Sequence, residues 1–133
     1  MKGYISNIEK DTIENNNFRK VIYTAKHSQL VLMSLNPGEE IGEEVHTVDQ
    51  FLRIEQGKGK AILDGVEYDV EDDFAIVVPA GARHNVINNT DGQMKLYTIY
   101  SGPEHKNDTI HSTRADAMTD TQDKFDGTTT ELI

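Results

Sequence analysis

Two stretches of the chain decide how the rest is interpreted: residues 38–57 (GEEIGEEVHTVDQFLRIEQG) and residues 73–88 (DFAIVVPAGARHNVIN). Side chains two apart on a strand point to the same face, so Glu44, His46 and Gln50 share one side wherever the first stretch is extended. On a straight strand they would span about 20 Å, too far for one ion. The chain must therefore bend or bulge between His46 and Gln50. A β-barrel can then bring His84, which follows a turn in the second stretch, against the other three.

The chain as far as about residue 112 has the pattern of short β-strands separated by turns. Asp64-Gly65 suits a tight hairpin turn that needs positive φ, and Asp91-Gly92 marks another turn. No strand is followed by a long amphipathic helix pattern. The spacing predicts an all-β fold, an antiparallel double-sheet β-barrel of the jelly-roll type. Its strands are expected in the apolar runs at residues 21–23, 30–35, 51–54, 61–63, 66–70, 74–78, 85–88 and 94–100.

The two ends of the chain differ from this pattern. We divide the chain into an N-terminal arm (1–17), the β-barrel (18–112) and a C-terminal helix with its tail (113–133). The polar first segment is expected to be an arm plus a loop. Thr113 and Asp116 have the spacing of a capping box, which predicts a short C-terminal helix. The tail from about Gly127 is expected to be frayed.

Length and composition exclude several classes of function. A chain of 133 residues corresponds to one domain. It has no cysteine, so disulfides, zinc ribbons and thiol catalysis are excluded. A formal net charge of −10 argues against binding to nucleic acid or to anionic membranes. The N-terminus lacks the apolar run of a signal peptide and no stretch is long enough to cross a bilayer, so we expect a cytoplasmic protein.

The spacing of residues in both stretches resembles the two motifs of the cupin superfamily. The first stretch has Gly38, five residues, Glu44-Val45-His46, three residues, Gln50, six residues and Gly57. The second has Asp73, five residues, Pro79-Ala80-Gly81, two residues, His84, three residues and Asn88. The chain departs from the family pattern at three positions, where Glu44 replaces a His, Gln50 replaces a Glu and Asp73 replaces a Gly. It is similar to small single-domain (type-2) cupins described as mannose-6-phosphate isomerase-like.

The resemblance implies a site for one divalent metal ion per chain, held by Glu44, His46, Gln50 and His84. Compared with the usual cupin set of three imidazoles and one carboxylate, the carboxylate has moved but the formal charge stays −1. Imidazole and oxygen donors suit zinc, manganese, iron, nickel or cobalt, so the metal stays open. Gln50 has a second possible role, a hydrogen bond to a metal-bound water. Glu44 is also a candidate catalytic base.

Three functions are compatible with such a site. We favour a metalloenzyme acting on a small polar, oxygen-rich molecule, with isomerase-like chemistry on a sugar. Few cationic residues are expected near the cavity, which weakens the case for a phosphorylated substrate. Two His and one carboxylate also resemble the ligand set of non-haem iron dioxygenases. The remaining alternative is a non-catalytic cupin that binds a small ligand.

Cupin resemblance also implies a homodimer, for which the outward-facing Phe51 is a suitable interface residue. Asn88 is expected to hold a turn by hydrogen bonding. His105 and His111 follow the last expected strand, and we expect an exposed or capping role for both. His27 has no supporting pattern and is expected at the surface.

Overall fold

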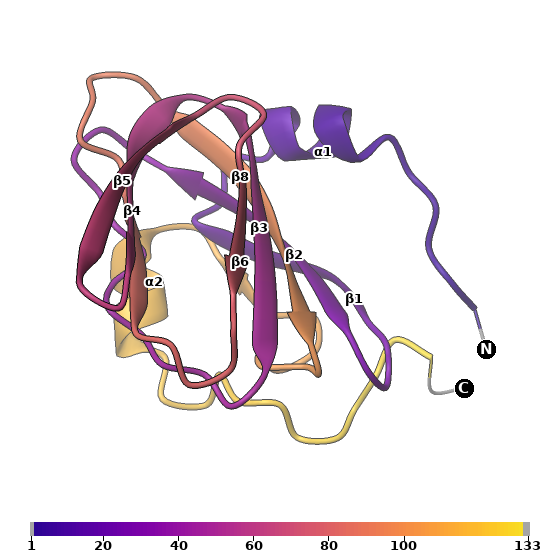
Figure 1. Cartoon of the computed structure of the whole chain (residues 1–133). Helices are drawn as coiled ribbons and strands as arrows, with labels where there is room; N and C mark the ends of the chain where they lie inside the picture. Colours follow the sequence, from indigo (N-terminus) through magenta and orange to yellow (C-terminus); the bar gives the residue numbers. More distant parts are fainter. Residues whose placement is uncertain (1, 132–133) are drawn as a thin grey trace.

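The computed structural model describes residues 2–131 as two antiparallel β-sheets facing each other, with a short helix towards each end of the chain (Figure 1). The six-stranded sheet has the order β6-β3-β8-β2-β1-β9 and the three-stranded sheet the order β5-β4-β7. This arrangement confirms the all-β jelly-roll class, although the sheets do not close into one barrel. The elements are α1 (Ile8–Glu14), β1 (Arg19–Thr24), β2 (Gln29–Leu35), β3 (Asp49–Gln56), β4 (Lys58–Leu63), β5 (Val66–Glu71), β6 (Ala75–Val78), β7 (His84–Ile87), β8 (Met94–Ser101), β9 (Ile110–His111) and α2 (Arg114–Thr119).

The core lies between the two sheets and follows the period-two alternation of the strands. On β3, Leu52 and Ile54 are buried while Phe51, Arg53 and Glu55, which alternate with them, are partly exposed. Leu96 on β8 and Val86 on β7 face the same interior. Burial of these apolar side chains is the main stabilising contribution, and it fixes the register of the strands that carry the candidate site.

One tight turn confirms a prediction from the sequence, and one further residue has a left-handed backbone that was not predicted. Asp64 (φ 47°) and Gly65 (φ 83°) join β4 to β5 with positive φ at both positions. Asp73 also has positive φ, at 72°. The cupin motif has a Gly at this position, and Asp tolerates the left-handed conformation better than most residues. The departure at Asp73 is therefore compatible with the local backbone.

The N-terminal segment contains a helix that was not expected. α1 begins after Asn7, whose side chain accepts a hydrogen bond from the backbone N–H of Lys10 at 3.1 Å. At its other end, the buried Lys95 Nζ donates to the carbonyl of Asn15 and to Asn16 Oδ1. Seven residues are too few to show a clear helical period, and the lysine that anchors the helix lies far away in the sequence. For these two reasons the sequence predicts an arm and a loop where the structure has a helix.

The C-terminal segment matches the prediction in its helix and differs in its tail. Thr113 and Asp116 form the capping box that starts α2. The tail is not frayed as far as residue 131, because the backbone of Thr24 exchanges hydrogen bonds with the backbone and side chain of Thr130. β9, which pairs with β1, was also not anticipated. No helix within residues 2–131 is long and apolar enough to cross a membrane.

Candidate functional site

The two sequence motifs meet through the backbone of Glu44 and His84. The N–H of Glu44 donates to the carbonyl of His84 at 2.9 Å, and the N–H of His84 donates back at 3.0 Å. The chain is irregular from residue 45 to residue 48 before β3 begins, so the expected break between His46 and Gln50 is present. Gln50 is the second residue of β3 and is buried on its inward face. All four residues named from the sequence therefore lie at one end of the two facing sheets.

The two His rings lie side by side with their centroids 5.0 Å apart. His46 Nδ1 lies 3.1 Å from Glu104 Oε1, and His84 Nδ1 lies 3.0 Å from the carbonyl oxygen of Ala82. With Nδ1–H donating to an oxygen in each ring, the neutral imidazole has its lone pair on Nε2. Second hydrogen bonds of this kind usually orient the His ligands of metal sites.

Two polar atoms at this place are buried and have no hydrogen-bond partner within residues 2–131. They are His46 Nε2 and Gln50 Oε1. Glu44 Oε2 lies 3.4 Å from His46 Nε2, but not in hydrogen-bonding geometry. The other end of the Gln50 amide donates to Thr98 Oγ1 at 2.9 Å, which fixes the orientation of Oε1. Buried polar atoms are normally satisfied, so two buried acceptors without partners need an explanation.

Among residues 2–131, no three His, Asp or Glu side chains lie close enough together to hold an ion, and this includes Glu44, His46 and His84 as the structure has them. Gln50 Oε1 is a further, neutral oxygen donor of the kind that metal ions accept.

The carboxylates around His46 raise its pKa, whereas the charge of Arg19 lowers it. Burial alone would lower the pKa of His46, but the hydrogen bond with Glu104 and the charges of Glu44 and Glu104 outweigh it, so this pKa is raised. The hydrogen bond from His46 in turn lowers the pKa of Glu104, against the effect of burial. The site is thus electronegative, which favours a cation.

A cavity of about 330 Å³ opens beside the candidate site. Glu44 and Glu104, both of which contact His46, line it together with Arg19, His105 and Asp123. A volume in this range accommodates a small polar molecule of a few carbon atoms up to a monosaccharide.

Comparison with known proteins decides the family. The family model for the cupin domain matches residues 31–100, which is more than half of the chain. The chain belongs to the cupin family. This cupin is 49% identical over 124 residues to the uncharacterised protein YrkC of Bacillus subtilis, a match that covers 88% of the chain and 67% of the relative.

Two further relatives agree with this assignment. An uncharacterised protein of Acanthamoeba polyphaga mimivirus is 46% identical over 109 residues, covering 77% of the cupin and 67% of the relative. The crystal structure of the protein BH2720 from Bacillus halodurans is 41% identical and superposes with a TM-score of 0.87, covering 90% of the cupin and 96% of that chain. None of these names assigns an activity.

The sequence did not predict a row of buried polar side chains that contact one another beside the site. Tyr100 packs edge-on against His46 and its hydroxyl lies 3.1 Å from His105 Nε2. His105 Nδ1 lies 2.8 Å from Asp123, which pairs with Arg19 at 3.7 Å. His105 and His111 are both buried, which excludes the exposed half of the expected exposed or capping role, while His27 is exposed as expected. These residues come from segments that lie far apart in the sequence, so no local sequence pattern predicts their contacts.

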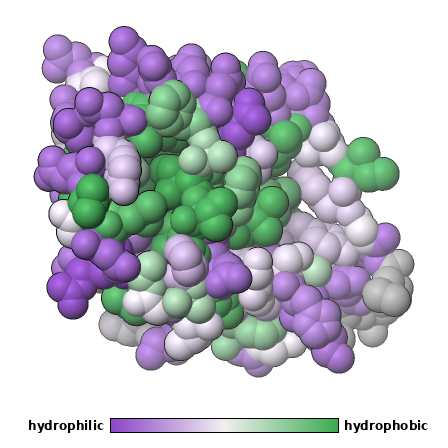
Figure 2. Space-filling model, viewed as in Figure 1, coloured by the Kyte–Doolittle hydropathy of each residue, from purple (hydrophilic) through white to green (hydrophobic). Residues whose placement is uncertain are grey.

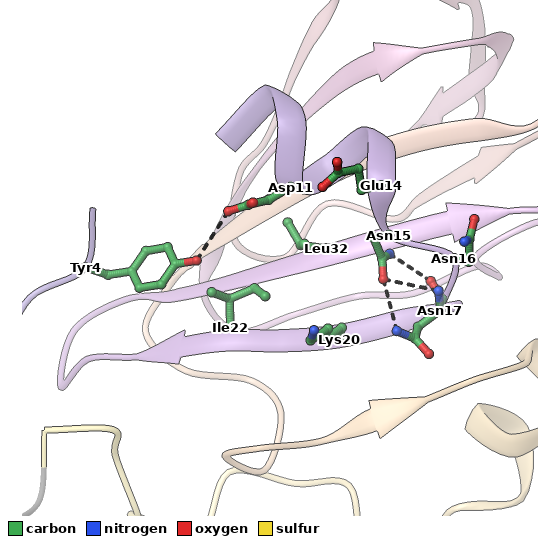
Figure 3. A pocket seen from close by; sticks show the side chains of 9 residues that line it. All are labelled: Tyr4, Asp11, Glu14, Asn15, Asn16, Asn17, Lys20, Ile22 and Leu32. Atoms are coloured by element: carbon green, nitrogen blue, oxygen red, sulfur yellow. Dashed lines mark hydrogen bonds between the residues drawn. The ribbon is translucent and has the colours of Figure 1, made fainter. Parts of the chain in front are cut away.

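A second cavity, of about 430 Å³, lies between α1 and the strands β1 and β2 (Figure 3). Two amide side chains that line it, those of Asn15 and Asn17, are hydrogen-bonded to each other. Asn15 Oδ1 accepts from the backbone and side chain of Asn17, and Asn15 Nδ2 donates to the Asn17 carbonyl. In contrast to the site at Glu44, this cavity has no buried polar atom without a partner among the residues that the structure describes.

Proposed function

We propose that this cupin binds one divalent metal ion through Glu44, His46, Gln50 and His84. The observation that carries the proposal is the pair of buried atoms without partners, His46 Nε2 and Gln50 Oε1. Both are lone-pair donors that a metal ion would satisfy. The set has two imidazoles, one carboxylate and one amide oxygen, which suits zinc, manganese, iron, nickel or cobalt.

We further propose that the site belongs to an enzyme acting on a small polar, oxygen-rich molecule, with isomerase-like chemistry. A divalent metal bound there would polarise a substrate carbonyl as a Lewis acid. The side chain of Glu44 is partly exposed and lines the cavity, where its carboxylate can accept a proton from a carbon next to a carbonyl. The likeness to mannose-6-phosphate isomerase-like cupins supports this class of reaction.

Contacts within the chain hold the side chains of the site in place for that step. Glu104 orients the His46 ring through Nδ1, and Ala82 does the same for His84. Tyr100 is fully buried, and burial raises the pKa of its hydroxyl, so it stays protonated beside His46. These contacts hold the imidazoles in fixed orientations before any ligand enters.

Elemental analysis of purified, unchelated protein tests the metal proposal. We expect close to one metal ion per chain, and loss of that metal in His84→Ala with the fold intact by circular dichroism. His27→Ala, which changes an exposed His, is the matched control and should keep its metal. Full metal content in His84→Ala, or no metal in the wild type even after reconstitution, would reject the site.

The identity of the metal separates the catalytic alternatives. Near-stoichiometric zinc or manganese supports isomerase-like chemistry, whereas iron together with oxygen consumption supports the dioxygenase alternative. A protein that binds no metal but still binds a small molecule corresponds to the non-catalytic cupin.

We also propose that the cupin is a homodimer. Val77 on the edge strand β6, Phe51 on β3 and Ile99 on β8 are neighbours across the six-stranded sheet. Val77 is 64% exposed, and Figure 2 shows hydrophobic residues gathered around β3 and β6. A two-fold axis would bring the same patch of a second copy against it, and pairing there would cover the free edge of β6.

A further inference from the structure

Arg19, at the start of β1, is a buried cation whose hydrogen bonds are incomplete. Only 7% of its side chain is exposed. Its known partners both engage Nη1, which lies 3.3 Å from His111 Nδ1 and 3.7 Å from Asp123 Oδ2. Nε is buried without a partner in the part of the chain that the structure describes.

The guanidinium lines the same cavity as Glu44 and Glu104. Three acidic residues of this cavity have partners: Asp123 pairs with His105 at 2.8 Å, Glu104 with His46 at 3.1 Å, and Glu43 with Arg83 at 3.7 Å. The fourth, Glu44, lies 3.4 Å from His46 Nε2. Arg19 belongs to the wall of this cavity and carries a buried donor, Nε, that has no partner among residues 2–131.

We infer that Arg19 binds the carboxylate of this cupin's ligand, which belongs to the class of small hydroxy or oxo carboxylic acids. The Nε and Nη2 edge of a guanidinium presents two parallel N–H groups that match the two oxygens of a carboxylate. The inference deepens the proposed function, since the hydroxyl or oxo group of the same ligand would lie towards Glu44.

Two other ligand classes fit less well. An uncharged polyol has no pair of anionic oxygens for the guanidinium fork. A phosphate ester carries about two negative charges and would meet the carboxylates of Glu44, Glu104 and Asp123 in a small cavity. A single carboxylate satisfies Arg19 with less repulsion.

The test follows the Nε–Hε signal of Arg19 in ¹⁵N-labelled protein by nuclear magnetic resonance. Glycolate, its uncharged analogue glycolamide, and inorganic phosphate are titrated in turn. We expect glycolate to shift the Arg19 signal saturably and more tightly than phosphate, and glycolamide to leave it in place. Arg19→Lys keeps the charge but loses the planar fork, and should weaken glycolate binding about tenfold or more by calorimetry.

Arg53→Lys is the matched control. Arg53 lies on β3 and pairs with Glu55 and Asp73 away from the cavity, so its replacement should leave the glycolate affinity unchanged. The inference is overturned if glycolamide shifts the Arg19 signal as glycolate does, if phosphate binds more tightly, or if Arg19→Lys binds glycolate as the wild type does. If Arg19→Lys does not fold, the comparison of glycolate with glycolamide on the wild-type signal decides.

Each titration is run on metal-loaded and on chelator-treated protein with the metal content measured. Glycolate binding to Arg19 in a protein that takes up no metal would support this inference and reject the metal site. A protein that holds its metal but gives no glycolate-dependent shift would support the metal site and reject this inference.

Discussion

Glu104 Oε1 lies 3.1 Å from His46 Nδ1, so a residue after the last long strand orients a ring that precedes β3. Glu104→Ala would leave that ring free to rotate and make its Nε2 a poorer donor. Loss of such a contact typically lowers metal affinity by about 10-fold to 100-fold. Competition with a chromogenic chelator measures the change. Glu67→Ala, an exposed acidic residue on β5, is the control, and equal affinities in the two variants would contradict the role of Glu104.

Gln50→Ala should loosen the metal without emptying the site. The variant removes one neutral donor and also leaves Thr98 Oγ1 without the amide that donates to it. Gln50→Glu, in contrast, adds a second carboxylate and should tighten binding. Metal dissociation constants of the two variants give the answer. If Gln50→Ala loses metal as completely as His84→Ala, Gln50 is a full ligand.

Asp123 should make stability depend on pH in the acidic range. Burial alone would raise the pKa of Asp123, but the hydrogen bond and charge of His105, together with Arg19, lower it overall. Because the folded state then binds fewer protons than the unfolded state, the contribution of Asp123 is complete above about pH 4 and is lost as the pH falls through the folded-state pKa.

Urea unfolding of wild type and Asp123→Asn over a pH series checks this expectation. The variant should be less stable by about 1–3 kcal/mol at pH 7, because it leaves Arg19 and His105 without a charged partner. The difference should shrink below about pH 4, where the carboxyl of the unfolded chain begins to bind a proton, and disappear below the lower pKa of the folded state. A difference that stays constant down to pH 3 would show that ionisation of Asp123 is not the cause.

Asn88 holds three segments together, as the sequence indicated for a turn. Its Nδ2 donates to the carbonyls of Leu35, Asn36 and Gly92, and the residue is fully buried. Asn88→Ala should lower the free energy of unfolding by about 3 kcal/mol, since buried acceptors lose their donor. The exposed neighbour changed in Asn89→Ala should stay within about 0.5 kcal/mol of wild type. Thermal or denaturant unfolding compares the two.

Val77→Lys should convert the proposed homodimer into a monomer. A charge at this position would be buried against its symmetry mate in the proposed interface. Light scattering after size-exclusion chromatography gives the mass, with Val66→Lys on β5 as a control for a new surface charge. A wild-type protein that is already monomeric would remove the interface altogether.

The fold was predictable because its signals are local. Turn residues such as Asp64-Gly65 and the fixed spacing around His84 lie within a few residues of what they specify, and they give strand boundaries and family together. The helix Ile8–Glu14 was not predictable, since its anchor Lys95 is about 80 residues away in sequence.

Some residues of the candidate site were likewise predictable from the sequence, and others were not. His46, Gln50 and His84 stand at motif spacings and were named from the sequence. Glu104 and Arg19 were not, because their contacts depend on how the segment after β8 folds across the ends of β1 and β3. Nothing near either residue in the sequence indicates that arrangement.

The cupin domain match ends at residue 100, whereas the cavity wall includes Arg19 before it and Glu104, His105 and Asp123 after it. Five of the nine residues that line the cavity thus lie outside the match, whereas Glu44 belongs both to the cavity and to the proposed metal site. Mutations in the flanking segments can therefore change ligand preference while the metal-binding residues stay intact, which makes these segments the natural place to diversify or to engineer selectivity.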